Sequence, residues 1–509
     1  MKNELRIGSM LSILSIILGS LIQILYTPMY MKYLGTSDYG INSLVQSIMG
    51  YVGILNLGLG SAIVRYTVRY RAEGKIEEEK SLNGMFLTIF FIIMGISILI
   101  GFYLYFMIPT LFIEKFTSIE LIKTQKVFIL MMISTAISFP ISVFSTNIVS
   151  RQKFVYQKGL SLLKMIITPI VGAILMTKGF GLLAVVTSVV ILNLITYIFD
   201  IFYAFKLGMR VKFKNFDINI LQDISKYSFY IFLNIIIDRI YWGTDRVIIG
   251  KYMGTSAVGI YTIASIFNQV YVNLSTAISG VLFPKINILV VENKLKELSD
   301  LFIKVGRLQY ILLGLISSGF MVFGKEFIYL WLGEGYSDVY IISLWIMIPA
   351  TIPLIQNTGI AILQARNLHQ FRSIIYFFIA ILNIINSIQL VKNYGAIGCA
   401  IATGISYILG NIIVMNIYYH KKINIDIILF WKSIFKMTIP IIIVFILGFI
   451  VNKIMINYSF KNFIFKGSIY TLLYLIFMYF IGMNMEEKNE VKKVMRKIKI
   501  KKRKEDNNL

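Results

Sequence analysis

Cysteine and histidine are almost absent from this chain of 509 residues. Cys399 is the only cysteine, so no disulfide can form within one chain. The two histidines, His369 and His420, stand alone in expected loops, and no Asp-x-Asp motif occurs. We therefore expect no metal site, and no pattern predicts catalytic residues or a cofactor.

Charged residues are scarce as well. Only 15% of the residues are Asp, Glu, Lys or Arg, whereas 57% are hydrophobic, and the mean hydropathy is +0.76. A soluble domain contains fewer apolar residues and more charged ones. Many stretches between charges reach the roughly 20 residues that a helix needs to cross a bilayer. The composition therefore predicts an all-α integral membrane protein.

These stretches predict about fourteen transmembrane helices. The first stretch is too long for the apolar part of a signal peptide and lacks a small-x-small cleavage site, so we expect it to persist as a helix. The expected ranges are 7–31, 39–62, 84–108, 126–149, 159–177, 181–205, 227–250, 257–284, 305–325, 339–364, 373–391, 396–418, 437–455 and 463–484.

The basic residues predict the orientation of these helices. One set of loops, including residues 65–80 and 206–214, is rich in Lys and Arg, whereas the opposite loops hold mostly single lysines. Because cytoplasmic loops retain basic residues, both termini are expected in the cytoplasm, with the chain spanning the cytoplasmic (cell) membrane. The net charge of +25 follows mainly from this topology, so we expect no nucleic-acid partner.

The C-terminal tail alternates apolar and basic residues at helical spacing. One helical face carries Val491, Val494, Met495 and Ile498, with lysines opposite. This pattern is typical of a helix that lies on anionic lipid. A solvated segment that only fixes topology is the alternative.

A short phrase occurs twice in the chain. KYLGTSDYGI at residues 32–41 returns as KYMGTSAVGI at 251–260, 219 positions later. Three further pairs keep this spacing within two residues: Glu73 and Glu292, Phe154 and Phe371, and Gly181 and Gly398. The period contains six expected helices, so the halves form a parallel repeat, which predicts two lobes with a substrate cavity between them. The glycines of the phrase are expected to allow a tight turn with positive φ.

The duplication predicts the domain organisation. We expect an N-lobe of helices 1–6 at residues 1–225 and a C-lobe of helices 7–12 at 226–432. Two additional helices at 433–485 and a basic cytoplasmic tail at 486–509 follow.

The repeated phrases carry a family resemblance. Together with the loop RYRAEGKIEEEK and the stretch DRVIIGKYMGTSAVGIYTIASIF, they resemble the polysaccharide-transporter (Wzx-type) flippases of the multidrug/oligosaccharidyl-lipid/polysaccharide exporter superfamily. The resemblance implies a two-lobed, V-shaped fold. It also implies that undecaprenyl-diphosphate-linked oligosaccharide units are moved to the outer leaflet, for surface polysaccharides of the capsule or O-antigen type. A polysaccharide polymerase and glycosyltransferases are the partners that it implies.

The expected seventh helix contains four charges in IIIDRIYWGTDRVIIG, residues 235–250. Asp238 and Asp245 are seven residues apart, as are Arg239 and Arg246, so each pair lies on one stripe of a helix. No acid and base stand three or four residues apart, so their partners must come from elsewhere. A charge in the bilayer centre costs at least roughly 2.5 to 3.5 kcal/mol. The arginines suit a diphosphate and the aspartates suit a coupling cation or proton, whereas lobe packing is the alternative role.

Polar residues in other helices are the remaining candidates for substrate binding. We expect these side chains to face the cavity between the lobes, although membrane-buried amides often serve helix packing instead. They are Gln23 and Tyr26 in helix one, Asn42 and Gln46 in helix two, and Asn268 and Gln269 in helix eight.

Two other functions compete with a flippase. A drug/cation antiporter of the same superfamily would share the fold, but its site would favour net negative charge, and the helix at 235–250 carries matched acids and bases. A membrane polymerase or ligase of the same pathway would need carboxylates in sizeable outer loops, and the expected outer loops are short. The sequence therefore favours a non-enzymatic flippase that works by alternating access.

Overall fold

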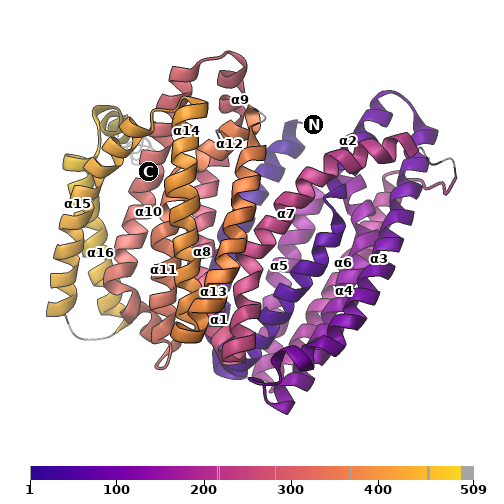
Figure 1. Ribbon diagram of the computed structural model, residues 1–509, viewed down its shortest axis with the longest axis horizontal. Helices are drawn as coiled ribbons and strands as arrows, with labels where there is room; N and C mark the ends of the chain where they lie inside the picture. The colour runs from indigo at the N-terminus through magenta and orange to yellow at the C-terminus, as the bar shows by residue number, and fades with distance from the viewer. Residues whose placement is uncertain are drawn as a thin grey trace, which may run out of the picture. The chain divides into compact units, whose positions relative to one another are not determined.

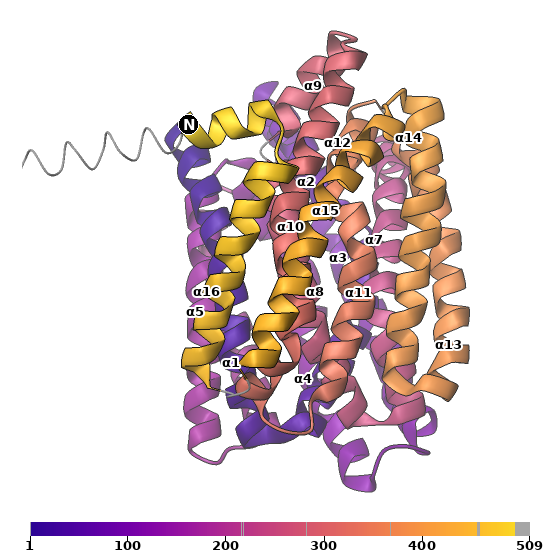
Figure 2. The same ribbon diagram turned by 90° about the vertical axis from the view of Figure 1, so that its left-hand side faces the viewer.

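The computed structural model describes residues 2–214, 216, 218–280, 282–366, 368–455 and 459–493. Throughout this part of the chain the secondary structure is helical, with no strand (Figures 1 and 2). The helices are α1 (Lys2–Val52), α2 (Leu59–Ala72), α3 (Ile76–Phe112), α4 (Ser118–Ser150), α5 (Phe154–Thr177), α6 (Leu182–Lys206), α7 (Ile218–Met253), α8 (Thr255–Gly280), α9 (Phe283–Val291), α10 (Leu295–Leu332), α11 (Ser337–Ile355), α12 (Asn357–Ala365), α13 (His369–Tyr407), α14 (Asn416–Ile423), α15 (Ile427–Ile454) and α16 (Phe460–Phe477). Short 3₁₀ or π segments lie at Gly53–Asn56, Ile408–Met415 and Met478–Gly482.

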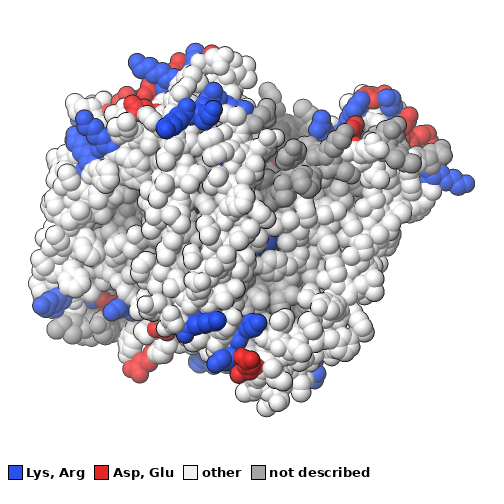
Figure 3. All heavy atoms as spheres, viewed as in Figure 1, with Lys and Arg blue, Asp and Glu red and all other residues white. Residues whose placement is uncertain are grey.

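The described helices confirm the predicted all-α membrane class. Ten of them are long and apolar enough to cross a membrane, or eleven if one bent pair is a single span. On the face shown in Figure 3, Lys, Arg, Asp and Glu gather near the helix ends, and few charges lie between them. The expected count of fourteen is not confirmed, because some elements merge two expected helices: α1 and α13 each continue through a non-helical glycine, Gly35 and Gly395.

The described chain forms two compact units. The first contains residues 1–270, 341–346 and 370–406, and the second contains 271–340, 347–369 and 407–509. The first unit thus adds α7, most of α8 and most of α13 to the six N-terminal helices. The predicted lobe boundaries at 225 and 432 differ from this division and remain a prediction.

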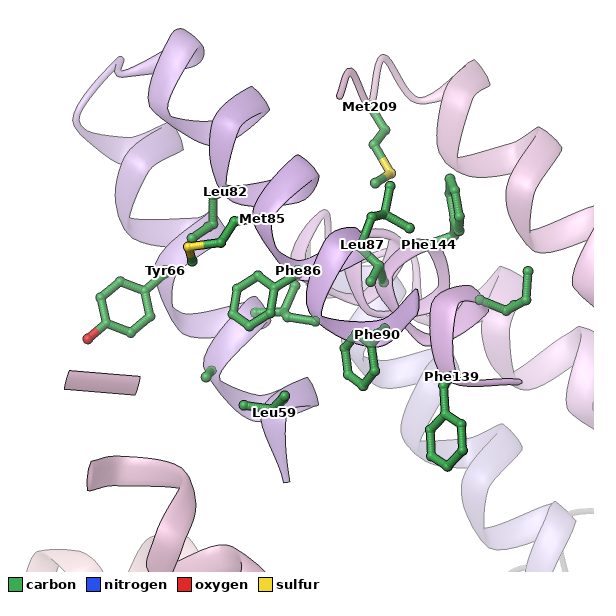
Figure 4. Close-up of a cluster of buried hydrophobic side chains, with 14 of the residues drawn as sticks. Leu59, Tyr66, Leu82, Met85, Phe86, Leu87, Phe90, Phe139, Phe144 and Met209 are labelled. Atoms are coloured by element: carbon green, nitrogen blue, oxygen red, sulfur yellow. The ribbon is translucent and has the colours of Figure 1, made fainter. Parts of the chain in front are cut away.

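An apolar core holds the first unit together. Leu59 and Tyr66 of α2, Phe86 and Phe90 of α3 and Phe139 of α4 are all buried in it (Figure 4). Aromatic side chains bury large areas each, so such a cluster fixes the packing of α2, α3 and α4. This core supports the helices against which α1 and α7 pack.

The first glycine of the repeated phrase has a similar φ angle in both copies. This φ is positive in each case, 78° at Gly35 and 91° at Gly254. Gly74 and Asn293, also 219 positions apart, both have positive φ as well. The predicted need for positive φ is therefore confirmed at the first glycine of each copy, whereas it is wrong for the second, Gly40 and Gly259, whose φ is not positive.

The two copies of the phrase also pack against each other within the first unit. A Cβ atom at Gly40 would collide with the carbonyl oxygen of Thr255, and one at Gly259 would collide with that of Thr36. One turn farther along each helix, the Ser43 and Thr262 hydroxyls are hydrogen-bonded at 2.7 Å. Equivalent residues therefore meet in a reciprocal contact that only glycine permits.

Glu120 of α4 adds hydrogen bonds to this contact between the two copies. Its carboxylate accepts hydrogen bonds from Ser37 (2.6 Å) and Thr255, which come from the first and second copy of the phrase. The hydroxyl oxygens of Ser37 and Thr255 lie 2.9 Å apart. The N-terminal end of α4 thus contacts both copies of the phrase. These contacts give a physical reason why the phrase occurs twice: its two copies are complementary surfaces.

Two ion pairs fasten the last helices to α10 in the second unit, where α10, α15 and α16 lie side by side (Figure 2). Lys466 of α16, fully buried, contacts Glu326 at 2.5 Å and the Asn452 amide oxygen at 3.1 Å. Arg307 forms a two-pronged pair with Glu487, with Nε–Oε1 at 2.7 Å and Nη2–Oε2 at 2.8 Å. Removing one partner of such a pair leaves a buried charge unpaired, which is strongly destabilising.

The ion pair between Arg307 and Glu487 ties the beginning of the predicted basic tail, residues 486–509, to α10. Residues 494–509, with three of the four residues of its predicted apolar stripe, lie outside the described ranges. Glu487 lies before them and is buried against Arg307. A chain cut after Met485 would lose this pair as well as the tail, so a cut after Lys493 separates the two effects.

We expect Gly40→Ala to lower the free energy of unfolding by about 1–3 kcal/mol, because the new methyl group collides with the Thr255 carbonyl. The matched control is Gly95→Ala in α3, where nothing lies within 4 Å of the added Cβ, and helix propensity favours alanine by up to about 1 kcal/mol. Thermal unfolding of the purified variants in detergent measures the change in stability that each substitution causes. Equal unfolding temperatures for Gly40→Ala and Gly95→Ala would contradict the reciprocal contact.

Candidate functional site

The described charged side chains of residues 235–250 in α7 differ in their burial. Asp245 is buried, at 5% exposure, and Arg246 is half-buried. Arg239 is exposed, and the side chain of Asp238 lies outside the described part of the structure. The α7 site therefore consists of one buried acid and two bases with different surroundings.

Hydroxyl groups hold the Asp245 carboxylate. Tyr261 of α8 donates to Oδ2 at 2.5 Å, Thr403 of α13 donates to Oδ2 at 3.0 Å, and Ser387 of α13 donates to Oδ1 at 3.1 Å. The Asn383 amide in turn donates to the Thr403 hydroxyl at 3.3 Å. Tyr261 and Thr403 thus satisfy one carboxylate oxygen, and the Ser387 proton is shared between the other and the Asn383 amide oxygen, 3.0 Å away.

This set of oxygen atoms has a definite chemical capacity. A buried carboxylate can take up a proton, and a carboxylate surrounded by hydroxyl and amide oxygens can hold a small hard cation. Within the described part of the chain, no group of three or more His, Cys, Asp or Glu side chains could hold a metal ion. The cluster therefore suits reversible uptake of one positive charge better than a permanent metal centre.

The arginines of α7 lie against the second part of α1. Arg246 donates to the Ser47 hydroxyl at 3.4 Å. Arg239 approaches Gly50, where an added Cβ would lie 3.3 Å from Nη1. Tyr51 and Thr244 are hydrogen-bonded beside them. Residues at positions 47, 50 and 51 of α1 thus form the surface on which both guanidinium groups rest.

The other predicted polar residues fall into two groups. Gln23 and Tyr26 line a common cavity of about 470 Å³ between α1 and α5, together with Ser161, Lys164 and Thr168. Tyr26 reaches across to α5, where a Cβ at Gly172 would collide with its hydroxyl. The structure therefore places these two residues in a pocket, although Arg239, Asp245 and Arg246 do not line it.

The second group does not share that pocket. Asn42 is half-buried and Gln46 is exposed, and both lie next to the face of α1 that contacts α7 and α8. Asn268 is buried at 1% exposure, whereas its neighbour Gln269 is exposed. These four residues are not brought together with the pocket residues, and their substrate-binding role remains a prediction.

Sequence reasoning missed several residues of these sites. Tyr261, Ser387 and Thr403 are ordinary polar residues in apolar helices, and no spacing along one chain indicates that they meet at Asp245. Lys164 did carry a signal, because it is the one charged residue in the expected membrane span 159–177. The α7 charges were selected as candidates because a charge inside the bilayer costs free energy, and the same argument applies to Lys164.

Comparison with solved structures identifies the fold. The lipid II flippase MurJ in an inward closed conformation matches 92% of this chain and 97% of its own, with a TM-score of 0.73 and 18% identity. An inward-facing multidrug resistance MATE family transporter of the MOP superfamily matches 80% of this chain and 94% of its own, with a TM-score of 0.59 and 14% identity. At these identities the likeness concerns the fold.

Comparison of sequences identifies the family. A protein of Haloferax volcanii named probable flippase AglR is 30% identical over 199 residues, 37% of this chain. The chain matches about two fifths of that relative's length, 41%. The profile of a family described as polysaccharide biosynthesis protein matches residues 5–289, more than half of the chain. This multi-pass membrane protein therefore belongs to the polysaccharide biosynthesis protein family, with the fold of the MOP superfamily.

Proposed function

We propose that this protein is a flippase that moves undecaprenyl-diphosphate-linked oligosaccharide units across the cytoplasmic membrane. It would do so by alternating access, for surface polysaccharide synthesis of the capsule or O-antigen type. Family membership, the name of the Haloferax volcanii relative and the fold shared with a lipid II flippase support the proposal. None of these proteins is named as an enzyme, which favours transport over a polymerase or ligase.

The observation that carries this proposal is the pair of guanidinium groups on α7. Arg246 rests on Ser47 and Arg239 on Gly50, so both guanidinium groups lie along the same stretch of α1. A guanidinium group binds phosphate oxygens in a two-pronged, charge-assisted geometry. A lipid diphosphate is the anion that such a pair suits, whereas an organic cation would be repelled by it.

Asp245 supplies the proposed coupling site. Its three hydroxyl partners stabilise the charged carboxylate, and Asn383 holds one of them in place. Uptake of a proton or a small cation would change the charge beside Arg246, its neighbour in sequence. An ion gradient could in this way bias the affinity of α7 for the diphosphate.

Localisation and partners follow from the same proposal. Both termini would lie in the cytoplasm, and the basic tail would lie on anionic lipid. Glycosyltransferases and a polysaccharide polymerase would act before and after the transport step. The drug/cation antiporter is the second candidate, because a MATE transporter shares the fold.

The first prediction concerns the arginines. Arg239→Ala and Arg246→Ala should each remove charge-assisted hydrogen bonds worth roughly 1.5 to 3 kcal/mol, which lowers affinity for lipid-linked oligosaccharide about ten- to hundredfold. Lysine should restore only part of the loss. Binding and delivery are measured with purified variants in liposomes, and Arg210→Ala, at an exposed position, is the control. Wild-type binding and delivery by both alanine variants would refute the assignment.

The second prediction concerns Asp245. In liposomes with an imposed proton or sodium gradient, we expect wild-type delivery to accelerate. Asp245→Asn, which keeps the shape but not the charge, should deliver at the same rate with and without either gradient while still binding the oligosaccharide lipid. Asp300→Asn, at an exposed position, should behave as wild type. A variant at Asp245 that still responds to the gradient would show that coupling occurs elsewhere.

A further inference from the structure

Lys164 occupies the middle of an apolar helix. It lies ten residues after Phe154, about 15 Å along the axis of α5. Leu163, Ile166 and Ile170 beside it are exposed, as expected of a helix face in lipid. A cation at this depth is costly, and such residues in membrane helices generally serve a binding site or an ion pair.

The Lys164 side chain belongs to the pocket between α1 and α5. Ser161 and Thr168, three residues before and four after it, lie on the same face of α5 and also line the pocket. Gly19, Gln23 and Tyr26 form the opposite wall on α1. At about 470 Å³ the pocket has the size of ordinary ligand sites.

Two polar groups of this pocket lack an ordinary protein partner. Among the described residues, no carboxylate oxygen lies within 4.0 Å of the Lys164 nitrogen, although Asp200 of α6 is near enough to interact electrostatically. The Thr168 hydroxyl is buried and has no hydrogen-bond partner in the described part of the chain. A cation whose described carboxylate neighbour, Asp200, lies beyond ion-pair distance and an unsatisfied hydroxyl one helical turn away both favour an anionic ligand with several acceptor oxygens.

We propose that this pocket binds a phosphate group of a lipid, with Lys164 as the charge partner and Thr168 as a hydrogen-bond donor. Phosphate supplies acceptor oxygens for both groups at once, and Gln23 can donate a third hydrogen bond from α1. Neither Arg239 nor Arg246 lines the pocket, so it is a second phosphate position, distinct from the one proposed at those two residues.

Two lipids carry this chemistry. One is the diphosphate lipid that forms the carrier of the cargo, a source that rests on the proposed function. The other is an anionic phospholipid of the surrounding membrane, a source that does not. The two are separated by measuring each lipid alone.

The test uses the purified full chain in nanodiscs of phosphatidylcholine. Binding of undecaprenyl diphosphate without a glycan and binding of phosphatidylglycerol are titrated separately. Lys164→Met removes the charge at similar length, Lys164→Arg keeps it, and Thr168→Val removes only the hydroxyl. Lys178→Met, at an exposed lysine directly after the same helix, is the control. Thermal unfolding of each variant verifies that it is folded.

We expect Lys164→Met to weaken binding of one of the two lipids ten- to hundredfold, with Lys164→Arg and Lys178→Met near wild type and Thr168→Val between them. Loss for undecaprenyl diphosphate assigns the pocket to the carrier, and loss for phosphatidylglycerol alone assigns it to a phospholipid. Unchanged binding of both lipids by folded Lys164→Met and Thr168→Val overturns the proposal. If Lys164→Met does not fold, the Thr168→Val and Lys164→Arg titrations decide, and unchanged binding by Thr168→Val then overturns it. A wild-type chain that binds these lipids but does not move oligosaccharide would refute the proposed function and leave this site intact.

Discussion

The cost of placing charge inside an apolar helical bundle constrains the rest of this structure. In the second unit the cost is met by direct pairing, since Lys466 contacts Glu326 and Arg307 contacts Glu487. In the first unit Asp245 is instead satisfied by neutral hydroxyl groups from α8 and α13. Buried charges that fasten α10 to the last helices are thus met by ion pairs, whereas the buried charge of α7 is met by neutral partners. This difference is what separates structural charges from candidates for function.

The duplication supplies a second constraint. The first glycine of each repeated phrase makes a turn, and the second glycine allows the two phrases to approach each other. Both requirements fall on the same ten residues, so the phrase diverges less than the helices around it. The copies no longer match in charge, because α7 carries the aspartates and arginines and the equivalent part of α1 carries none. Packing at the phrase is thus shared between the repeats, whereas the four charges of residues 235–250 belong to the second one.

Much of the fold could be predicted from sequence, and the sites only in part. Membrane helices could be predicted from the length of the apolar stretches and the spacing of the charges, because both signals depend only on residues within one segment. The ends of the helices were harder to predict: α1 continues through Gly35 to Val52, although a helix end was expected at residue 31. The partners of Asp245 could not be predicted, because Tyr261 and Thr403 meet it only through the packing of three helices. Lys164 was accessible to the same reasoning that selected α7, but a single charge without a second polar signal did not distinguish a site from an interruption.

The central claim is that this chain moves a lipid diphosphate carrying an oligosaccharide, and not a small cation. Liposomes that contain the purified wild-type protein and a lipid-linked oligosaccharide in one leaflet test it most directly, with an impermeant reagent that oxidises the glycan only in the other leaflet. Efflux of a fluorescent organic cation is followed in parallel. The account predicts protein-dependent appearance of the oligosaccharide and no protein-dependent cation efflux. Cation efflux without movement of the oligosaccharide would contradict it.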